Sequence, residues 1–388
     1  MEKRPPFTRF LLSLFKVGLT AYGGPAIVAQ LRQELVRRQK WVTEEEFAES
    51  LAFAQLIPGP VVPATAAHAA QRLYGPLAAF PAVCAYAIPA FALMLGLSAV
   101  YFRWGKLPTV SASFRLLGPV IVGIVASATL QLAQPALRDF RGLFLAGALL
   151  PLFLARCNPV MVVLLGAVLG LVIFSGEGGV GSLAVVPKGS RRRALAWGSL
   201  TAAVLLLLLA SLAISHRPLA SLALKVAKIS LMAFGGGYTA VALMFHAFVD
   251  AQPPLLPTKE FVDGLALGQL TPGPVIITAT FVGYKVAGVL GAVVATVYTF
   301  LPPAVLVTVL APHVSRLRES LWFRRAVRGA LAAFVALLLH VLAVVASGTL
   351  TEPWAGPVAL VAFVSLSAGA PVLVLVALGV ISGFLGLI

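Results

Sequence analysis

The residues with the clearest chemical potential form a short motif that the chain carries twice. Residues 54–61 read Ala-Gln-Leu-Ile-Pro-Gly-Pro-Val, and residues 268–275 read Gly-Gln-Leu-Thr-Pro-Gly-Pro-Val. Proline has no N–H and pushes the residue before it out of the helical region, so a helix must break at each motif. The helix that begins after a break presents unpaired amides and the positive end of its dipole. The motif therefore predicts two backbone sites for a negatively charged group.

A second pair of breaks is predicted upstream of the first. Residues 16–25 read Lys-Val-Gly-Leu-Thr-Ala-Tyr-Gly-Gly-Pro, and they correspond to residues 228–237, Lys-Ile-Ser-Leu-Met-Ala-Phe-Gly-Gly-Gly. Because glycine lets a solute approach the backbone closely, four breaks paired across two copies predict one binding site. The alternative is that these glycines only allow close helix packing. The candidate substrate-binding residues are Lys16, Tyr22, Gly23, Gly24, Gln55, Pro58, Gly59, Pro60, Val61, Lys228, Gly235, Gly236, Gly237, Tyr238, Gln269, Thr271, Pro272, Gly273, Pro274 and Val275.

Charged residues near the breaks are candidates for the same chemistry. Lys16 and Lys228 occupy matching positions one to two turns before the Gly-Gly breaks. A lysine buried in a membrane is costly and is usually functional, whereas a lysine near a helix end can extend its amine to the interface. Glu49 and Asp263 also match each other, and they precede the Pro-Gly-Pro breaks. These two carboxylates could carry coupling protons, although capping or pairing with an arginine is the favoured alternative.

Composition indicates what surrounds these residues. Of the 388 residues, 60% are hydrophobic and 11% are charged, whereas a soluble domain carries about 25% charged residues. The chain is therefore expected to be an integral membrane protein. Segments with the length of a helical span, roughly 20 residues, are plain, and no ten-residue alternation typical of a membrane barrel occurs. The spanning windows are residues 116–137, 194–216, 286–315, 329–351 and 353–388.

The motifs also define the domain organisation. The first transmembrane repeat covers residues 7–174, and the second covers residues 219–388. Between them, residues 175–218 hold a basic loop and one connecting transmembrane helix. If each copy has an even number of spans, this extra crossing inverts the second copy. Opposite charge biases in equivalent loops favour the same conclusion. The predicted fold is all-α, with two inverted-topology repeats that contain broken or re-entrant helices.

Loop charges also predict the path of the chain through the bilayer. The N-terminus and residues 32–40 are both basic, so both should lie in the cytoplasm. Residues 8–38 and 44–74 would then enter and return as re-entrant hairpins. The alternative is that each forms one long kinked span. The net charge of +16 is assigned to cytoplasmic loops and not to nucleic-acid binding.

Several patterns exclude other functions. Residues 176–181 match a dinucleotide-binding glycine pattern, but no strand-helix-strand unit surrounds them. Residues 188–193 are basic and directly precede a spanning segment, which is typical of a topology anchor. No nucleotide-binding, nucleophile or metal-ligand motif occurs, so neither an enzyme, a cofactor nor a metal is expected. Cys84 and Cys157 are interpreted as packing residues.

The motifs at residues 16–25, 55–60 and 269–274, with Phe-Val-Gly-Tyr-Lys-Val-Ala-Gly at 281–288, resemble the chromate ion transporter (CHR) family, in its long-chain two-repeat form. The second copy departs from the pattern with Gly237 where the first has Pro25. The resemblance implies export of chromate across the bacterial cytoplasmic membrane, coupled to the proton gradient, with chromate resistance as the result. Its partners would be chromate or a related tetrahedral oxyanion, protons and the lipid bilayer, with a homodimer as one possible assembly.

Two alternatives stay open at the level of sequence. Another oxyanion, such as sulfate or molybdate, would use the same backbone donors. A membrane scaffold or sensor that binds without transport would carry the same breaks. For a transporter, alternating access is expected to move one copy against the other.

Overall fold

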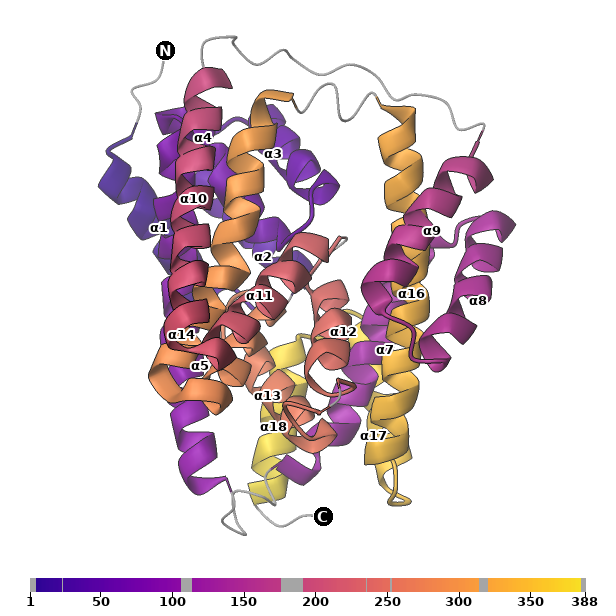
Figure 1. Cartoon of the computed structure of the whole chain (residues 1–388). Coiled ribbons are helices and arrows are strands. Elements are labelled where there is room, and N and C mark those ends of the chain that lie inside the picture. The colour runs from indigo at the N-terminus through magenta and orange to yellow at the C-terminus, as the bar shows by residue number, and fades with distance from the viewer. Residues whose placement is uncertain are drawn as a thin grey trace. The chain divides into compact units, whose positions relative to one another are not determined.

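The computed structural model describes residues 5–22, 24–105, 114–175, 191–234, 236–251, 253–313 and 320–384. Within these ranges every regular element is a helix (Figure 1). The expected all-α membrane fold is therefore confirmed. Gly23 and Gly235, together with residues 176–190 of the connecting loop, lie outside the described residues.

The helices follow the same order in both copies. The first copy contains α1 (Phe7–Thr20), α2 (Gly24–Arg32), the π-helix η1 (Gln33–Arg38), α3 (Glu44–Leu56), α4 (Val61–Tyr74), η2 (Pro76–Ala78), α5 (Ala79–Trp104), α7 (Leu117–Ala136), α8 (Phe140–Leu154) and α9 (Pro159–Ile173). Helix α10 (Arg191–Ser215) is the connector. The second copy contains α11 (Arg217–Met232), α12 (Gly237–Phe248), α13 (Thr258–Leu270), η4 (Val275–Ile277), α14 (Thr278–Leu310), η5 (Ala311–His313), α16 (Leu321–Thr349), α17 (Ala355–Ser367) and α18 (Val372–Phe384).

Helix α14 combines two elements of the first copy. Its backbone leaves the helical region at Ala287 and Gly288, and Gly288 has a positive φ, as does Gly75 between α4 and α5. The chain reverses at this kink, because the Thr280 and Thr296 hydroxyls on either side of it are 2.8 Å apart. Residues 278–286 therefore correspond to α4, and residues 289–310 correspond to the spanning helix α5.

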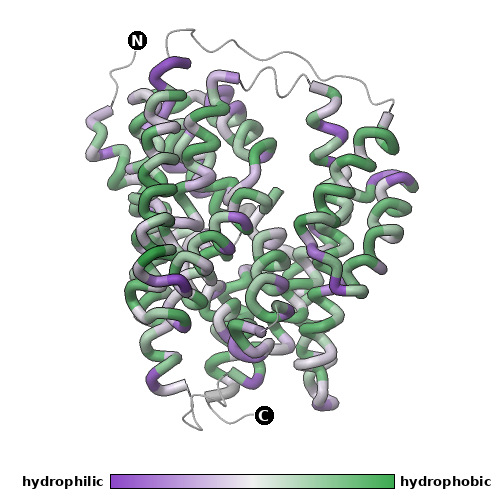
Figure 2. The backbone as a smooth tube through the Cα atoms, in the orientation of Figure 1, coloured by the Kyte–Doolittle hydropathy of each residue, from purple (hydrophilic) through white to green (hydrophobic). Residues whose placement is uncertain are grey.

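Among the described residues, five helical segments are long and apolar enough to cross a membrane: Pro76–Trp104, Leu117–Ala136, Arg191–Ser215, Val275–His313 and Leu321–Thr349. The last four coincide with predicted windows, whereas Pro76–Trp104 lies outside them. The fifth predicted window, residues 353–388, exceeds the length of one span. It forms the short helices α17 and α18, with a positive φ at Gly369 between them. Apolar residues dominate the helices (Figure 2), as expected for segments that face lipid.

The chain folds into two compact units, and each draws on both sequence copies. The first contains α1 to α4, α5 as far as Ala99, α10, α11, η4 and α14. Within it, α14 packs against α4, α10 and α11, and these helices run close together in Figure 1. The second contains α7 to α9, α12 from Tyr238 onward, α13 and α16 to α18, with α16 packed against α7, α8 and α9. The two copies are therefore interleaved in each unit.

The segment at residues 44–74 is a hairpin and not a kinked span. Nδ1 of His68 on α4 lies 2.9 Å from Oγ of Ser50 on α3. Farther from the break, the Arg72 guanidinium contacts the carboxylates of Glu46 and Glu49. These contacts require the two helices to run antiparallel. Each helix has 13 or 14 residues and is about 20 Å long, too short to cross a bilayer core of about 30 Å.

The segment at residues 8–38 also folds back on itself. Oγ of Ser13 on α1 donates to the Glu34 carboxylate on η1 over 3.3 Å, and the Gln30 side chain donates to Thr20 next to the break. Phe10 and Leu14 on α1 are fully buried with Leu31 in the core that holds this hairpin together. Both segments of the first copy therefore have the hairpin geometry that the loop charges predict.

Close glycine contacts hold the second unit together and give a testable prediction. A Cβ atom added to Gly329 on α16 would lie 2.1 Å from the carbonyl oxygen of Gly166 on α9. Gly329→Ala is therefore expected to destabilise the protein by about 1–3 kcal/mol, because the helices must separate. Thermal unfolding in detergent measures the loss. Gly348→Ala on the same helix meets no atom within 4 Å and serves as the control. Equal losses in both variants would contradict the packing role.

Candidate functional site

The four predicted helix breaks are present, and a helix begins after each. Helix α1 ends at Thr20 before α2 begins at Gly24, and α3 ends at Leu56 before α4 begins at Val61. In the second copy, α12 begins at Gly237, and the 3-10 helix η4 begins at Val275. The local cause is the proline and glycine content, since positive φ values occur at Gly59, Gly236 and Gly273.

The breaks of the two copies meet in reciprocal pairs within the first unit. The Gly59 N–H donates to the Ala233 carbonyl over 2.9 Å, and the Gly273 N–H donates to the Ala21 carbonyl over 2.9 Å. Each Pro-Gly-Pro break of one copy is thus bonded to the Gly-Gly region of the other. The backbone bonds therefore connect breaks of different types from the two copies.

The two glycine amides have a different role from the one expected. They were assigned to a solute, but both donate to backbone carbonyls. The space beside each glycine is also occupied by protein. A Cβ on Gly59 would lie 2.7 Å from Pro303 Cβ, and a Cβ on Gly273 would lie 3.0 Å from Ala90 Cβ. These glycines are needed because a side chain would separate the copies.

The amides that follow each break remain as donors. The first intrahelical bond of α4 joins the Ala64 N–H to the Pro60 carbonyl over 3.1 Å, so the amides of Val61 and Val62 precede it. In η4 the first bond joins the Ile277 N–H to the Pro274 carbonyl, so the amides of Val275 and Ile276 precede it. Such amides have no partner within their own helix. The helix dipole makes them suited to an anion.

Gln269 carries the clearest unsatisfied donor among the candidate side chains. It is 7% exposed, and its Nε2 has no hydrogen-bond partner within the described chain. The side chain of Tyr238, another candidate, lies next to the Gln269 amide. A buried amide group without a partner is costly, and a ligand is one explanation for it. The matching Gln55 of the first copy is exposed, so the two copies are not equivalent here.

The remaining candidates differ in burial between the copies. In the second copy, Thr271, Pro272, Gly273, Pro274 and Val275 are all buried. In the first copy, Gly59 and Pro60 are buried, whereas Tyr22, Pro58 and Val61 are partly exposed. The Pro-Gly-Pro break of the second copy is therefore less exposed to solvent than that of the first copy.

Neither candidate lysine is buried within the chain, because the side chains of Lys16 and Lys228 are both exposed. Lys16 lines a polar cavity of about 270 Å³ inside the first hairpin, with Arg38 as a second cation. Glu34 in this cavity already accepts hydrogen bonds from Ser13 and Gln39. Two cationic side chains, Lys16 and Arg38, therefore line the cavity together with the Glu34 carboxylate, which already has hydrogen-bond partners. Its other lining residues are Val17, Ala26, Ala29, Gln30 and Gln33.

The two carboxylates considered for proton coupling both have partners. Glu49 pairs with Arg72. Asp263 is 2% exposed, and it accepts hydrogen bonds from the Tyr101 hydroxyl over 2.7 Å and from Lys259 Nζ over 3.2 Å. Glu49 therefore pairs with an arginine, as the favoured alternative states, whereas the partners of Asp263 are a tyrosine and a lysine. A role in proton coupling stays a prediction.

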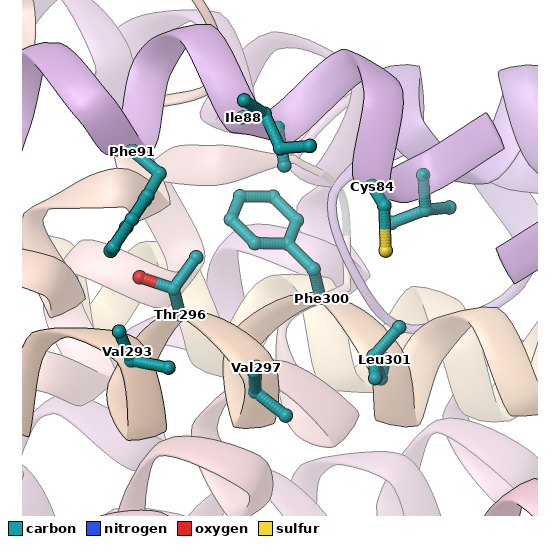
Figure 3. Close-up of a pocket in the computed structure, with 10 residues that line it drawn as sticks. Cys84, Ile88, Phe91, Val293, Thr296, Val297, Phe300 and Leu301 are labelled. Carbon is teal, nitrogen blue, oxygen red and sulfur yellow. The ribbon is translucent and has the colours of Figure 1, made fainter. Parts of the chain in front are cut away.

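A second cavity, in the first unit, is apolar. It lies between α5 and α14 and has a volume of about 190 Å³. Ile88 and Phe91 of α5 face Thr296 and Phe300 of α14 across it (Figure 3). The Thr296 hydroxyl donates to the Ala292 carbonyl. With no charged group and no amide side chain in its lining, this cavity is unsuited to an oxyanion.

Comparison with known proteins gives the family. The family model described as chromate transporter matches residues 8–171 and 220–386. The chain belongs to the chromate transporter family. It is 34% identical to an uncharacterized transporter of Methanocaldococcus jannaschii, over 88% of this chain and 85% of the relative. It is 32% identical to the chromate transport protein of Pseudomonas aeruginosa, over 76% and 70% of the two chains. The chromate transport protein of Cupriavidus metallidurans is 28% identical, over 94% and 88%.

Membership of the chromate transporter family confirms the resemblance drawn from the motifs. No solved structure matches the chain. Sequence reasoning identified the breaks but missed their partners, Ala90 and Pro303. A signal existed, because Pro89-Ala90 and Pro302-Pro303 match at an offset of 213 inside two long apolar windows. Proline within a spanning helix often marks a site where neighbouring segments pack closely.

Proposed function

We propose that the chain exports chromate across the bacterial cytoplasmic membrane as a secondary active transporter. In this proposal the transport is coupled to the proton gradient and confers chromate resistance. Membership of the chromate transporter family supports the substrate, and relatives named chromate transport proteins extend over most of the chain. The proposal includes a multi-pass arrangement with a cytoplasmic N-terminus and two inverted repeats at residues 7–174 and 219–388.

The main support for the proposed binding site is the pair of backbone hydrogen bonds that joins the breaks of the two copies. Within the first unit, it joins Gly59 of one copy to Ala233 of the other, and Gly273 to Ala21. The proposed ligands for a tetrahedral dianion are the amides of Val61 and Val62 and those of Val275 and Ile276. Thr271 of the same unit would add a side-chain donor, and Gln269 and Tyr238 of the second unit stay candidates from the sequence motifs. Lys16 and Lys228 would attract the anion, and Glu49 or Asp263 would carry a proton. A homodimer remains an expected assembly.

Flux in proteoliposomes tests the function. The purified protein should accumulate labelled chromate when a pH gradient is imposed, and empty vesicles should not. Excess unlabelled sulfate or molybdate should compete weakly. Strong competition by either anion would identify a broader oxyanion transporter. Chromate binding without flux would identify a membrane sensor or scaffold.

A further inference from the structure

A carboxylate flanked by two imidazoles lies in the second unit, outside the candidate substrate residues. Asp250 follows the C-terminal end of α12. Its Oδ2 is 3.7 Å from Nδ1 of His246 on α12 and 3.6 Å from Nε2 of His340 on α16. The side chains of Asp250 and His340 are 11% and 10% exposed. Residues far apart in the sequence therefore form one compact titratable cluster.

The cluster is not satisfied by the protein around it. Asp250 Oδ2 and His340 Nδ1 are buried, and neither has a hydrogen-bond partner within the described residues. Burial alone would raise the pKa of Asp250, but the two imidazoles more than offset this effect and hold its pKa below the usual value. Asp250 is therefore an anion at neutral pH. A proton gained by either imidazole would place a positive charge beside that anion.

The first copy carries the same pair with its charges exchanged. The offset of 212 that relates Lys16 to Lys228 also relates Glu34 to His246 and Arg38 to Asp250. Arg38 Nη1 lies 3.6 Å from Glu34 Oε2, which matches the spacing of the second-copy pair. Arginine does not lose its proton in proteins, so the first-copy pair keeps its charges. Histidine has both a neutral and a protonated form in proteins, so the second-copy pair differs from the first in having an exchangeable proton.

Few other charges lie on the helices packed against α16. Helices α7 and α9 contain no titratable residue. On α8 the Arg141 guanidinium donates to the Ile173 and Ser175 carbonyls. On α13, Lys259 pairs with Asp263. The further charged residues of these elements are Glu260 on α13 and Arg324, Arg325 and Arg328 on α16.

We propose that Asp250, His246 and His340 form a further proton-binding site, separate from the candidate carboxylates Glu49 and Asp263, with His340 as the residue that holds the proton in this cluster. A proton from water binds the imidazole on one side of the membrane and leaves it on the other, so no further reactant is needed. His340 lies on α16, which is long and apolar enough to cross a membrane. The assignment to transport rests on the proposed function, but the existence of the proton site does not.

Histidine NMR titration tests the site without transport. The chain contains five histidines, so labelled histidine in lipid nanodiscs gives a simple spectrum, and His340→Gln assigns the resonance. We expect the His340 signal to change with pH as the imidazole gains or loses a proton. We also expect this pH dependence to differ in Asp250→Asn, because the neighbouring anion is removed. A His340 signal that does not respond to pH, or that responds identically in Asp250→Asn, would overturn the proposal.

Flux measurements then test the coupling. His340→Gln places in α16 the residue type that the first copy has at the matching Gln131. It should retain downhill chromate flux within about threefold but lose accumulation driven by the pH gradient. His216→Gln, at an exposed histidine, is the control and should keep both. Accumulation by His340→Gln at the control level would reject the coupling role. If the unmodified protein shows no flux, the proposed function fails, and the NMR titration still decides the proton site.

Discussion

Replacing Gly59 or Gly273 with alanine should reduce chromate transport by at least about tenfold while the protein still inserts into the membrane. Both residues have positive φ values, +121° and +105°, which alone disfavour alanine by about 1–3 kcal/mol. The added methyl group would also lie within 3.0 Å of Pro303 or Ala90. The reciprocal backbone bonds must then lengthen, and the helix ends that we assign to the anion move apart. Flux in proteoliposomes at matched protein density measures the loss.

Two variants separate contact from backbone strain. Gly75→Ala has a similarly positive φ, +97°, but no atom lies within 4 Å of its added Cβ. It should keep most of the transport. Gly273→Ala combined with Ala90→Gly removes the opposing methyl group and should recover part of the flux. If Gly75→Ala is as damaging as Gly59→Ala, strain and not contact between the copies is responsible.

Gln269→Leu is expected to lower chromate affinity by about 10- to 100-fold. A hydrogen bond to a charged group contributes about 1.5–3 kcal/mol, and Gln269 Nε2 is a buried donor that makes no hydrogen bond of normal geometry within the described residues, although Tyr238 lies next to it. The same substitution should leave thermal stability unchanged or raise it slightly, because a buried polar group without a partner is removed. Loss of affinity without loss of stability is the signature of a ligand-binding residue.

Chromate affinity and thermal stability are compared by measuring equilibrium binding and thermal unfolding on the same sample of each variant. Gln131→Leu is the matched control, because Gln131 is exposed on α7 and should change neither quantity. A Gln269→Leu protein that unfolds at a lower temperature and binds chromate normally would show that the side chain has a structural role instead.

Much of the fold could be predicted because proline, glycine and hydropathy act locally. The Pro-Gly-Pro and Gly-Gly sequences stop a helix whatever surrounds them, so all four breaks were predicted correctly. The uncharged, apolar composition of the predicted windows identified four of the segments that are long and apolar enough to cross a membrane. Hydropathy does not locate the turn at Gly369 inside the window at residues 353–388, because the positive φ of this glycine has no hydropathy signal.

The contacts of the site depend on tertiary packing, and the sequence did not reveal them. Nothing local indicates that the Gly59 amide donates to Ala233 and not to a solute. Burial also depends on residues far away in the sequence, since Gln55 and Gln269 have the same motif around them but opposite exposure. The pairing of Asp250 with His340 joins residues 90 positions apart. Only the repeat offset, which pairs Glu34 with His246, links that cluster to a pattern in the sequence.

The two backbone bonds between Ala21 and Gly273 and between Ala233 and Gly59 have a consequence for motion. Sliding one half of the sequence past the other at this point would leave two buried N–H groups without acceptors, at about 1–3 kcal/mol for each. Any cycle that carries an ion across must therefore keep these four segments together as a fixed pivot. The displacement expected between the halves then has to be a rotation about that pivot, with the bending confined to residues elsewhere in the chain.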